Sequence, residues 1–479
     1  MKRLLIFLFL AGILSAKPVE PGPIDKQIIS LTFNEDYDLA KKLCQEQINL
    51  NPNSPKYYYY IINAKIMEIG KRVGELDLNK RDEGRKSLNK EIINYCENVV
   101  DKFDESNLNN EDKFYYGTIC AYLARVYGTD GSWWSAFKAG KKSKNIMEDI
   151  LQSDSSFYDA YLILGMLEYY ADRMSGITSF IAGVLGLSGD RAKGLFHLQL
   201  AYEKGTLTFA QTALTLIEVN SNLESNELAA LGYYENFIKH FPQNRRILNA
   251  YFHSLLNTIK YKKAEDLIKN DKQNLLDDYA RSRYYDIKGN LRLAIQYGET
   301  ALENEKNLVR GGGSSVRYII TYNSWLLGDW TTVSKYEQSL SDRGKESFSL
   351  IKKNEKESRW LHDLSVLIAN EKPISEIESF AKSKPYLSNA KGFEDEFNLL
   401  LGAFYFKNNL YNKAEQFFQK SINAEDDRDK FTALKSLIDI YMWQSVDKYK
   451  VENLISAIKN SKNDRLSYRS KDLEKKYNL

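Results

Sequence analysis

The chain has 479 residues, about three times the length of a typical single-core domain, so we expect several domains or one elongated repeat array. Its composition, 43% hydrophobic and 27% charged, excludes disorder along the whole chain, and a net charge of +3 gives no electrostatic reason to expect a nucleic-acid partner. Only 8 prolines and 26 glycines are present, too few turn-forming residues for a β-sandwich or β-barrel, so helices are favoured.

Residues 1–16 have the pattern of a secretory signal peptide. Lys2 and Arg3 precede the apolar run 4–14, and the small residue Ala16 offers a cleavage position. The run is shorter than the roughly 20 residues that a helix needs to cross a bilayer. It is not followed by a cysteine, so the lipid-anchored form of this signal is not expected. We therefore expect an exported, soluble chain in the bacterial periplasm or cell envelope, with secretion as a further destination.

Three cysteines, Cys44, Cys96 and Cys120, are too few and too scattered for a disulfide-stabilised scaffold. Each lies in an apolar pattern with helical spacing. The sequence predicts that they are buried and act as small hydrophobic residues.

Residues 127–134, Tyr-Gly-Thr-Asp-Gly-Ser-Trp-Trp, are the strongest candidate for a binding site. Two adjacent tryptophans begin a predicted helix after a glycine-containing turn. Side chains of adjacent helical residues point about 100° apart, so both indoles can hardly face one core. Tryptophan is enriched at binding hot spots. We therefore predict Tyr127, Trp133 and Trp134 as partner-binding residues, against the alternative that both tryptophans pack between neighbouring helix pairs.

One apolar segment, residues 176–187, departs from the rest of the chain because it carries no charge. It is too short to cross a membrane. We expect an apolar helix packed inside the fold. The alternative is a peripheral membrane contact through Ile177 to Leu187, because an exposed apolar patch of this size marks an interaction site.

A pattern with a 34-residue period is clearest near the C-terminus. A Leu-Gly pair and an aromatic residue lie on a first helix, and an aromatic residue opens a second helix that also carries alanine, an aromatic and a small residue. The residues at these places are Leu401, Gly402, Tyr405, Tyr411, Ala414, Phe418 and Ser421. Weaker copies contain Ala230 with Pro242 and, 34 residues after Ala230, Ala264 with Tyr261 before it.

This pattern resembles the tetratricopeptide repeat (TPR). The resemblance implies an all-α fold, a TPR-like α-solenoid in which antiparallel helix pairs stack into a right-handed superhelix with a concave surface. Residues 187–198 are also similar to a segment of the TPR family that includes the yeast inclusion-body clearance protein of the mitochondrial outer membrane. Because the chain begins with an export signal, only the architecture is carried over from that family.

The predicted organisation has two helical parts after the signal peptide. An N-terminal TPR-like superhelix is expected over residues 23–310 and C-terminal TPR-like helical repeats over 314–479. The glycine-rich segment 311–315 between them suggests a flexible connection or bend. Longer helices are expected over residues 82–102 and 343–370.

The sequence offers no convincing set of catalytic, cofactor-binding or metal-binding residues. Its four histidines, 197, 240, 253 and 362, never have the i, i+4 spacing of a helical zinc site. The segment Gly140-Lys141-Lys142-Ser143 is similar to the end of a phosphate loop, but Ser135 stands where such a loop has its leading glycine and a second lysine follows Lys141, so a phosphate loop is rejected. We expect neither a cofactor nor enzymatic activity.

The resulting functional hypothesis is a non-enzymatic scaffold or adaptor that binds a protein or peptide partner in a concave groove, with no nucleic acid involved. The first alternative is a protein of the cell envelope that captures a glycan or small molecule. The second is a carbohydrate-active enzyme on a helical toroid, which predicts several carboxylates converging in a deep pocket.

Overall fold

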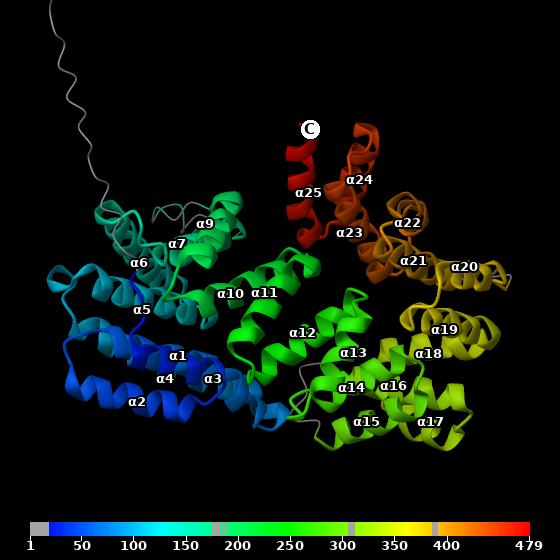
Figure 1. The fold of residues 1–479 in the computed structure, drawn as a ribbon, viewed down its shortest axis with the longest axis horizontal. Coiled ribbons are helices and arrows are strands. Elements are labelled where there is room, and N and C mark those ends of the chain that lie inside the picture. The colour runs from blue at the N-terminus through cyan, green and yellow to red at the C-terminus, as the bar shows by residue number, and fades with distance from the viewer. Residues whose placement is uncertain (1–18, 175–182, 184–185, 187–188, 305–311, 386–390) are drawn as a thin grey trace, which may run out of the picture. The chain divides into compact units, whose positions relative to one another are not determined.

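The computed structural model describes residues 19–174, 183, 186, 189–304, 312–385 and 391–479. Within these ranges all regular secondary structure is helical and 24 α-helices follow one another along the chain (Figure 1), which confirms the predicted all-α class. The predicted signal peptide 1–16 and nearly all of the apolar segment 176–187 lie outside the described residues. Among the helices that are described, none combines the length and apolar character needed to span a membrane.

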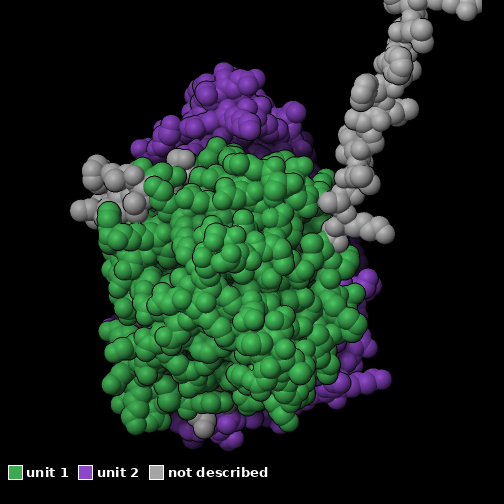
Figure 2. Space-filling view, turned by 90° about the vertical axis from the view of Figure 1, so that its left-hand side faces the viewer, with its two compact units in different colours: residues 1–216 green, residues 217–479 purple. Residues whose placement is uncertain are grey.

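The chain divides into two compact units, residues 1–216 and 217–479, which Figure 2 shows in different colours. The helices of unit 1 are α1 Pro23–Phe33, α2 Tyr37–Leu50, α3 Lys56–Gly74, α4 Arg81–Lys102, α5 Asn110–Thr129, α6 Trp133–Ser153, α7 Ala160–Asp172, α9 Arg191–Lys204 and α10 Phe209–Glu218, whose last residues belong to unit 2.

Unit 2 continues with the remaining helices. These are α11 Glu227–His240, α12 Arg245–Asn257, α13 Tyr261–Asn270, α14 Asp278–Ile287, α15 Leu291–Glu303, α16 Gly312–Leu327, α17 Trp330–Glu337, α18 Asp342–Lys353, α19 Glu355–Ala369, α20 Ile374–Lys382, α21 Lys391–Lys407, α22 Tyr411–Phe418, α23 Asp427–Trp443, α24 Lys448–Ser461 and α25 Asp464–Tyr477.

Most helices pack against the next one along the chain, and first helices of successive pairs also touch. Contacts of the second kind join α3 to α5, α12 to α14, α14 to α16 and α21 to α23. A helix pair exposes an apolar face that it cannot bury alone, and stacking on the next pair covers that face. The predicted TPR-like packing of helix pairs is therefore confirmed within each unit.

The turns inside the pairs repeat one backbone geometry. A residue with positive φ follows the first helix, and the next N–H donates to a carbonyl five residues earlier, as in the Schellman motif. Examples of the positive-φ residue are Glu35, Ile259, Gly289, Gly328 and Asn409. The corresponding hydrogen bonds include Asp36 to Leu31 at 2.9 Å, Asn290 to Tyr285 at 2.8 Å and Leu410 to Tyr405 at 2.9 Å.

Small residues allow the paired helices to approach closely. A Cβ atom added to Gly402 would lie 2.6 Å from the ring of Phe418, so the Gly and aromatic positions of the predicted repeat meet in space. In the pair α7–α9, a Cβ atom on Gly194 would lie 2.6 Å from the backbone nitrogen of Tyr169, and one on Gly165 would lie 2.9 Å from the Gly194 carbonyl oxygen. Here backbone lies against backbone.

The compact units divide between Leu216 and Ile217, and the predicted division into repeats over 23–310 and 314–479 stays a prediction. Two other expectations about organisation are not met, a flexible connection in the glycine-rich segment and one long helix over 343–370. Gly312 and Gly313 are instead buried in the first turn of α16, which packs on α15, so this glycine-rich stretch is helical where it is described. The long helix expected over 343–370 is broken at Asn354, whose φ of −123° and ψ of 52° end α18 and cap α19.

A buried ion pair joins α23 to α25 near the C-terminus. Arg469 on α25 lies 2.7 Å from Asp439 on α23, and both side chains are more than nine-tenths buried. Lys476 of α25 also donates to the carbonyl oxygens of Tyr441, Met442 and Gln444 at 2.7–2.8 Å. These bonds satisfy acceptors at the C-terminal end of α23, where helical carbonyls lack partners.

We predict that Gly194→Ala lowers the free energy of unfolding by about 1–3 kcal/mol, because the added methyl group has no room between two backbones. Gly232→Ala is the control: Gly232 is an exposed glycine within α11 and nothing lies within 4 Å of its Cβ position. That change should raise stability by up to about 1 kcal/mol through helix propensity. Urea denaturation followed by circular dichroism measures both, and equal effects would contradict the backbone-contact explanation.

Arg469→Met should destabilise the chain by about 3–5 kcal/mol, because it leaves the Asp439 carboxylate buried with its closest cation removed. Lys459→Met removes an exposed ion pair at 3.2 Å between α24 and α25 and should change stability by less than about 1 kcal/mol. The double variant Arg469→Met with Asp439→Leu should recover most of the loss in thermal denaturation. A double variant as unstable as the single one would refute the charge-burial argument.

Candidate functional site

The tryptophan pair predicted to bind a partner lies at the turn between α5 and α6. Helix α5 ends at Thr129, and Gly131 follows with a φ of +81°, a left-handed conformation that glycine adopts without strain. The N–H of Ser132 then donates to the carbonyl of Tyr127 at 2.9 Å. The chain reverses direction there, and Trp133 and Trp134 are the first two residues of α6.

Both indoles remain accessible to solvent. The exposed fractions are 42% for Trp133 and 52% for Trp134, so neither is buried between helix pairs. The Trp133 ring stacks on Phe137 one turn later, with centroids 6.4 Å apart and planes inclined by 29°. The Lys138 ammonium lies 5.5 Å from the Trp134 ring centroid. The pair therefore presents two aromatic surfaces, each held in place by a neighbour on α6.

Tyr127, the third predicted binding residue, lies near the C-terminal end of α5. It is half-buried, and its hydroxyl donates a hydrogen bond to the Glu97 carboxylate on α4. Burial, together with that carboxylate, raises the pKa of Tyr127 to about 12. The hydroxyl already has a partner and connects α5 to α4, so Tyr127 orients the turn beneath the tryptophans.

The helices that carry the tryptophans are held tightly together. Ser143 on α6 donates to the carbonyl of Gly117 on α5 at 2.7 Å, and a Cβ atom on Gly117 would lie 2.8 Å from the methyl carbon of Met147. Lys142 donates to the Tyr116 hydroxyl at 2.5 Å. The segment 140–143 is thus an ordinary part of a helix and forms no phosphate loop.

The described cysteines and histidines lack the features of a reactive centre. All three cysteines are buried free thiols, as predicted, and burial raises the pKa of each to about 12. Burial and the neighbouring Arg283 lower the pKa of His253 to about 3. In the part of the chain that the structure describes, no group of three or more His, Cys, Asp or Glu side chains could hold a metal ion.

Unit 2 contains carboxylates that the sequence did not single out. Asp286 on α14 accepts a hydrogen bond from the side-chain amide of Asn323 on α16 at 2.6 Å, and burial raises its pKa to about 6. Burial and repulsion by Asp426 raise the pKa of Asp429 on α23 to about 6. Among 64 acidic residues no sequence signal distinguishes these, because their environment comes from helices far apart in the chain.

Glu396 on α21 belongs to the same group although water reaches its side chain. The surrounding protein atoms weaken its solvation and Asp429 repels its charge, so its pKa rises to about 7. Raised pKa values are typical of functional sites and also of structural clusters.

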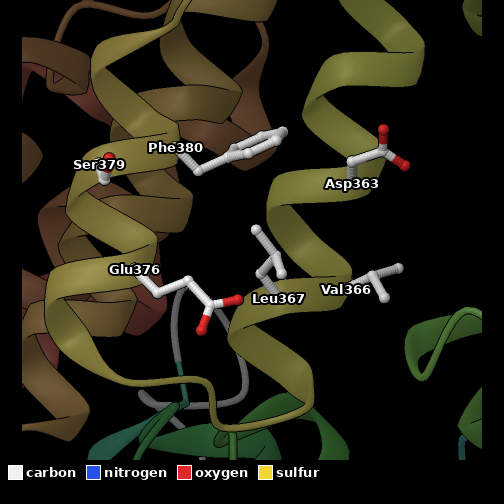
Figure 3. A pocket seen from close by; sticks show the side chains of 6 residues that line it. All are labelled: Asp363, Val366, Leu367, Glu376, Ser379 and Phe380. Carbon is white, nitrogen blue, oxygen red and sulfur yellow. The ribbon is translucent and has the colours of Figure 1, made fainter.

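An open hollow also lies in unit 2, between α19 and α20, with a volume of about 590 Å³. Figure 3 shows Leu367 and Phe380 in the space between the two helices and Glu376 beside it. The other lining residues are Asp363, Val366 and Ser379. Glu396 and Asp429 do not line it, so the carboxylates with raised pKa do not converge in this hollow as the carbohydrate-active enzyme alternative would require.

Comparisons with known proteins add little to this picture. No protein-family model and no curated protein sequence matches the chain. Among the solved structures that match is one titled "Crystal structure of APC/C hetero-tetramer Cut9-Hcn1", with 12% sequence identity over 93% of this chain and 94% of that chain and a TM-score of 0.24. A likeness this distant carries no argument, and the repeat architecture rests on the helix packing described above.

We predict that Asp286 makes stability fall as pH rises. Its folded pKa of about 6 lies above the ordinary value of 3.8, so the folded chain holds a proton that the unfolded chain releases. This contribution is complete below about pH 4 and is lost as the pH approaches 6. Asp286→Asn removes the charge and keeps an acceptor for Asn323, so it should stabilise the chain at pH 7.5 by about 1–2 kcal/mol.

Urea denaturation between pH 4 and 8 measures this effect, with the exposed carboxylate Asp149 changed to Asn as the control. The difference in stability between Asp286→Asn and the unchanged chain should grow over that interval, whereas the control should stay within a few tenths of a kcal/mol. A constant difference would show that the carboxyl group of Asp286 is not the one that titrates.

Proposed function

We propose that the chain is an exported scaffold that binds a protein or peptide partner, and that Trp133 and Trp134 contact this partner. The observation that carries the proposal is the accessibility of both indoles, 42% and 52%, at the start of a helix that is closely packed on its neighbour. A soluble protein gains stability by burying such side chains. Two adjacent indoles left in water are therefore better explained by a surface that another molecule covers.

The geometry beneath the tryptophans supports this role. Tryptophan contributes large contact area with little loss of side-chain entropy when it is already oriented. Trp133 is oriented by its stack on Phe137, and the turn below it is fixed by the hydrogen bond from Tyr127 to Glu97. Stacked TPR-like helix pairs commonly present surfaces for partners, and a groove formed by such pairs would extend the contact.

The signal-peptide pattern of residues 1–16 supports export, so the partner is sought in the bacterial periplasm or envelope. Protein binding is favoured over glycan capture because both indole rings already have a neighbour on α6. The Trp133 ring stacks on Phe137, and the Lys138 ammonium lies over the Trp134 ring. A sugar would stack on a broad, free aromatic face. The proposal assigns no catalytic role to the chain.

The test is affinity capture from the envelope fraction of the native host with the mature chain as bait. A specific protein partner should be retained, and Trp133→Ala with Trp134→Ala should weaken its binding at least about thirtyfold, as for a hot-spot residue worth about 2 kcal/mol. The control is Trp330→Ala with Trp443→Ala, which removes indoles that are 56% and 75% exposed elsewhere on the chain. This control should retain the partner.

Two results would contradict the proposal. If both double variants lose the partner equally, the loss reflects general stickiness of exposed tryptophan. If no protein is retained but a glycan is, the capture alternative replaces the scaffold. Export is tested separately by N-terminal sequencing of the chain recovered from the envelope fraction, which should begin after Ala16.

A further inference from the structure

The hollow between α19 and α20, called the α19–α20 groove below, combines an apolar floor with acidic edges. Val366, Leu367 and Phe380 form the floor and are only partly buried. Asp363 and Glu376 lie at the edges and both carboxylates are exposed. Figure 3 shows Leu367, Phe380 and Glu376 directed toward the space between the two helices, with Asp363, Val366 and Ser379 along the same helices.

The floor of the α19–α20 groove is rigidly supported. The Phe380 ring stacks on Trp360 of α19, with centroids 5.5 Å apart and planes inclined by 10°. Val366 packs on the turn at Gly289, where an added Cβ atom would lie 2.9 Å from both of its methyl carbons. Arg359, earlier on α19, donates to the Leu326 carbonyl on α16 at 2.9 Å. A preformed surface of this kind loses little entropy when a ligand covers it.

The carboxylates at the edges differ from their neighbours because they are unpaired. Among the described residues, neither Asp363 nor Glu376 forms an ion pair or a side-chain hydrogen bond. Nearby, Glu371 pairs with Lys407 and Glu378 pairs with Lys413, each at 2.7 Å. The chain therefore neutralises the carboxylates beside the groove and leaves the two that line it without a cation.

We propose that the α19–α20 groove binds a segment of a protein partner that presents an apolar side chain beside lysine or arginine. The apolar part covers Leu367 and Phe380, and the cationic group lies near the exposed carboxylates that line the groove, those of Asp363 and Glu376. Lysine and arginine suit such a place because their aliphatic stems lie on apolar surface while the charged heads stay in water. The inference rests on the proposed function, since it names the chemistry of a partner segment.

Charge decides between this occupant and others. An acidic segment or a phosphate would meet two unpaired carboxylates and be repelled. A small apolar molecule would leave both carboxylates without a partner and would be poorly enclosed by an open hollow. A basic and apolar segment satisfies the floor and the edges together.

The test uses short fluorescein-labelled peptides and the full chain. A peptide of alternating leucine and lysine should bind, and peptides of the same length made of leucine and glutamate or of glycine and lysine should bind at least about tenfold more weakly. Fluorescence anisotropy measures the affinities. Binding of the leucine–lysine peptide should also weaken as salt is raised, because the carboxylates are exposed.

The double variant Asp363→Asn with Glu376→Gln should bind the leucine–lysine peptide about tenfold more weakly than the unchanged chain. Its matched control is Glu371→Gln with Glu378→Gln, which removes the same charge from residues close in the chain whose carboxylates are already paired. The control should change the affinity less than about twofold. Hydrogen exchange should show protection by the peptide in residues 363–380 and should show none in the first variant.

Several outcomes would overturn the inference. Equal weakening by both variants would mean that the peptide senses only the overall charge. Absence of binding, or equal binding of the leucine–glutamate peptide, would remove the proposed chemistry. If the captured native partner depends on Trp133 and Trp134 but binds the Asp363→Asn, Glu376→Gln variant unchanged, the scaffold function stands and this inference fails. If no partner is captured at all, the scaffold function itself fails.

Discussion

The close approach of paired helices is the constraint on which the rest of the structure depends. Two helices can bring their backbones together only where side chains are small, and the contact then fixes their crossing point. At Gly165 and Gly194 the backbones of two helices lie against each other, and at Gly402 the backbone lies against an aromatic ring. Each crossing point sets where the next pair must stack. Local errors in one pair would therefore propagate along the unit.

The two proposed binding surfaces lie on helix pairs of this kind. Gly117 and Ser143 hold α5 and α6 in contact, and Trp133 and Trp134 lie at the turn that joins these two helices, where both indoles are accessible. In the α19–α20 groove, Leu367 and Phe380 lie between the two helices and form part of an open apolar floor.

The sequence predicted the features that depend on local pattern. Two features could be predicted from the sequence: the small and aromatic positions of the repeat at 401–421, and the burial of the cysteines. Spacing and composition directly indicate which residues are buried. The break at Asn354 was missed because an asparagine within a helical pattern can lie in a helix or end one, and contacts of α19 with α16 decide. Gly312 and Gly313 were interpreted as a connection because their close neighbours on α15 are not visible in sequence.

The candidate sites also depend on contacts between residues that are far apart in the sequence. Accessible tryptophans were predictable, since two adjacent helical side chains cannot share one core, but the structural use of the Tyr127 hydroxyl was not. The groove could not be found from the sequence, because Asp363 and Glu376 are two of 64 acidic residues and only the structure shows which carboxylates lack cations. In a chain whose positive and negative charges nearly balance, unpaired charge is a local property. Where it borders an exposed apolar floor, it specifies the charge of the molecule that can cover that floor.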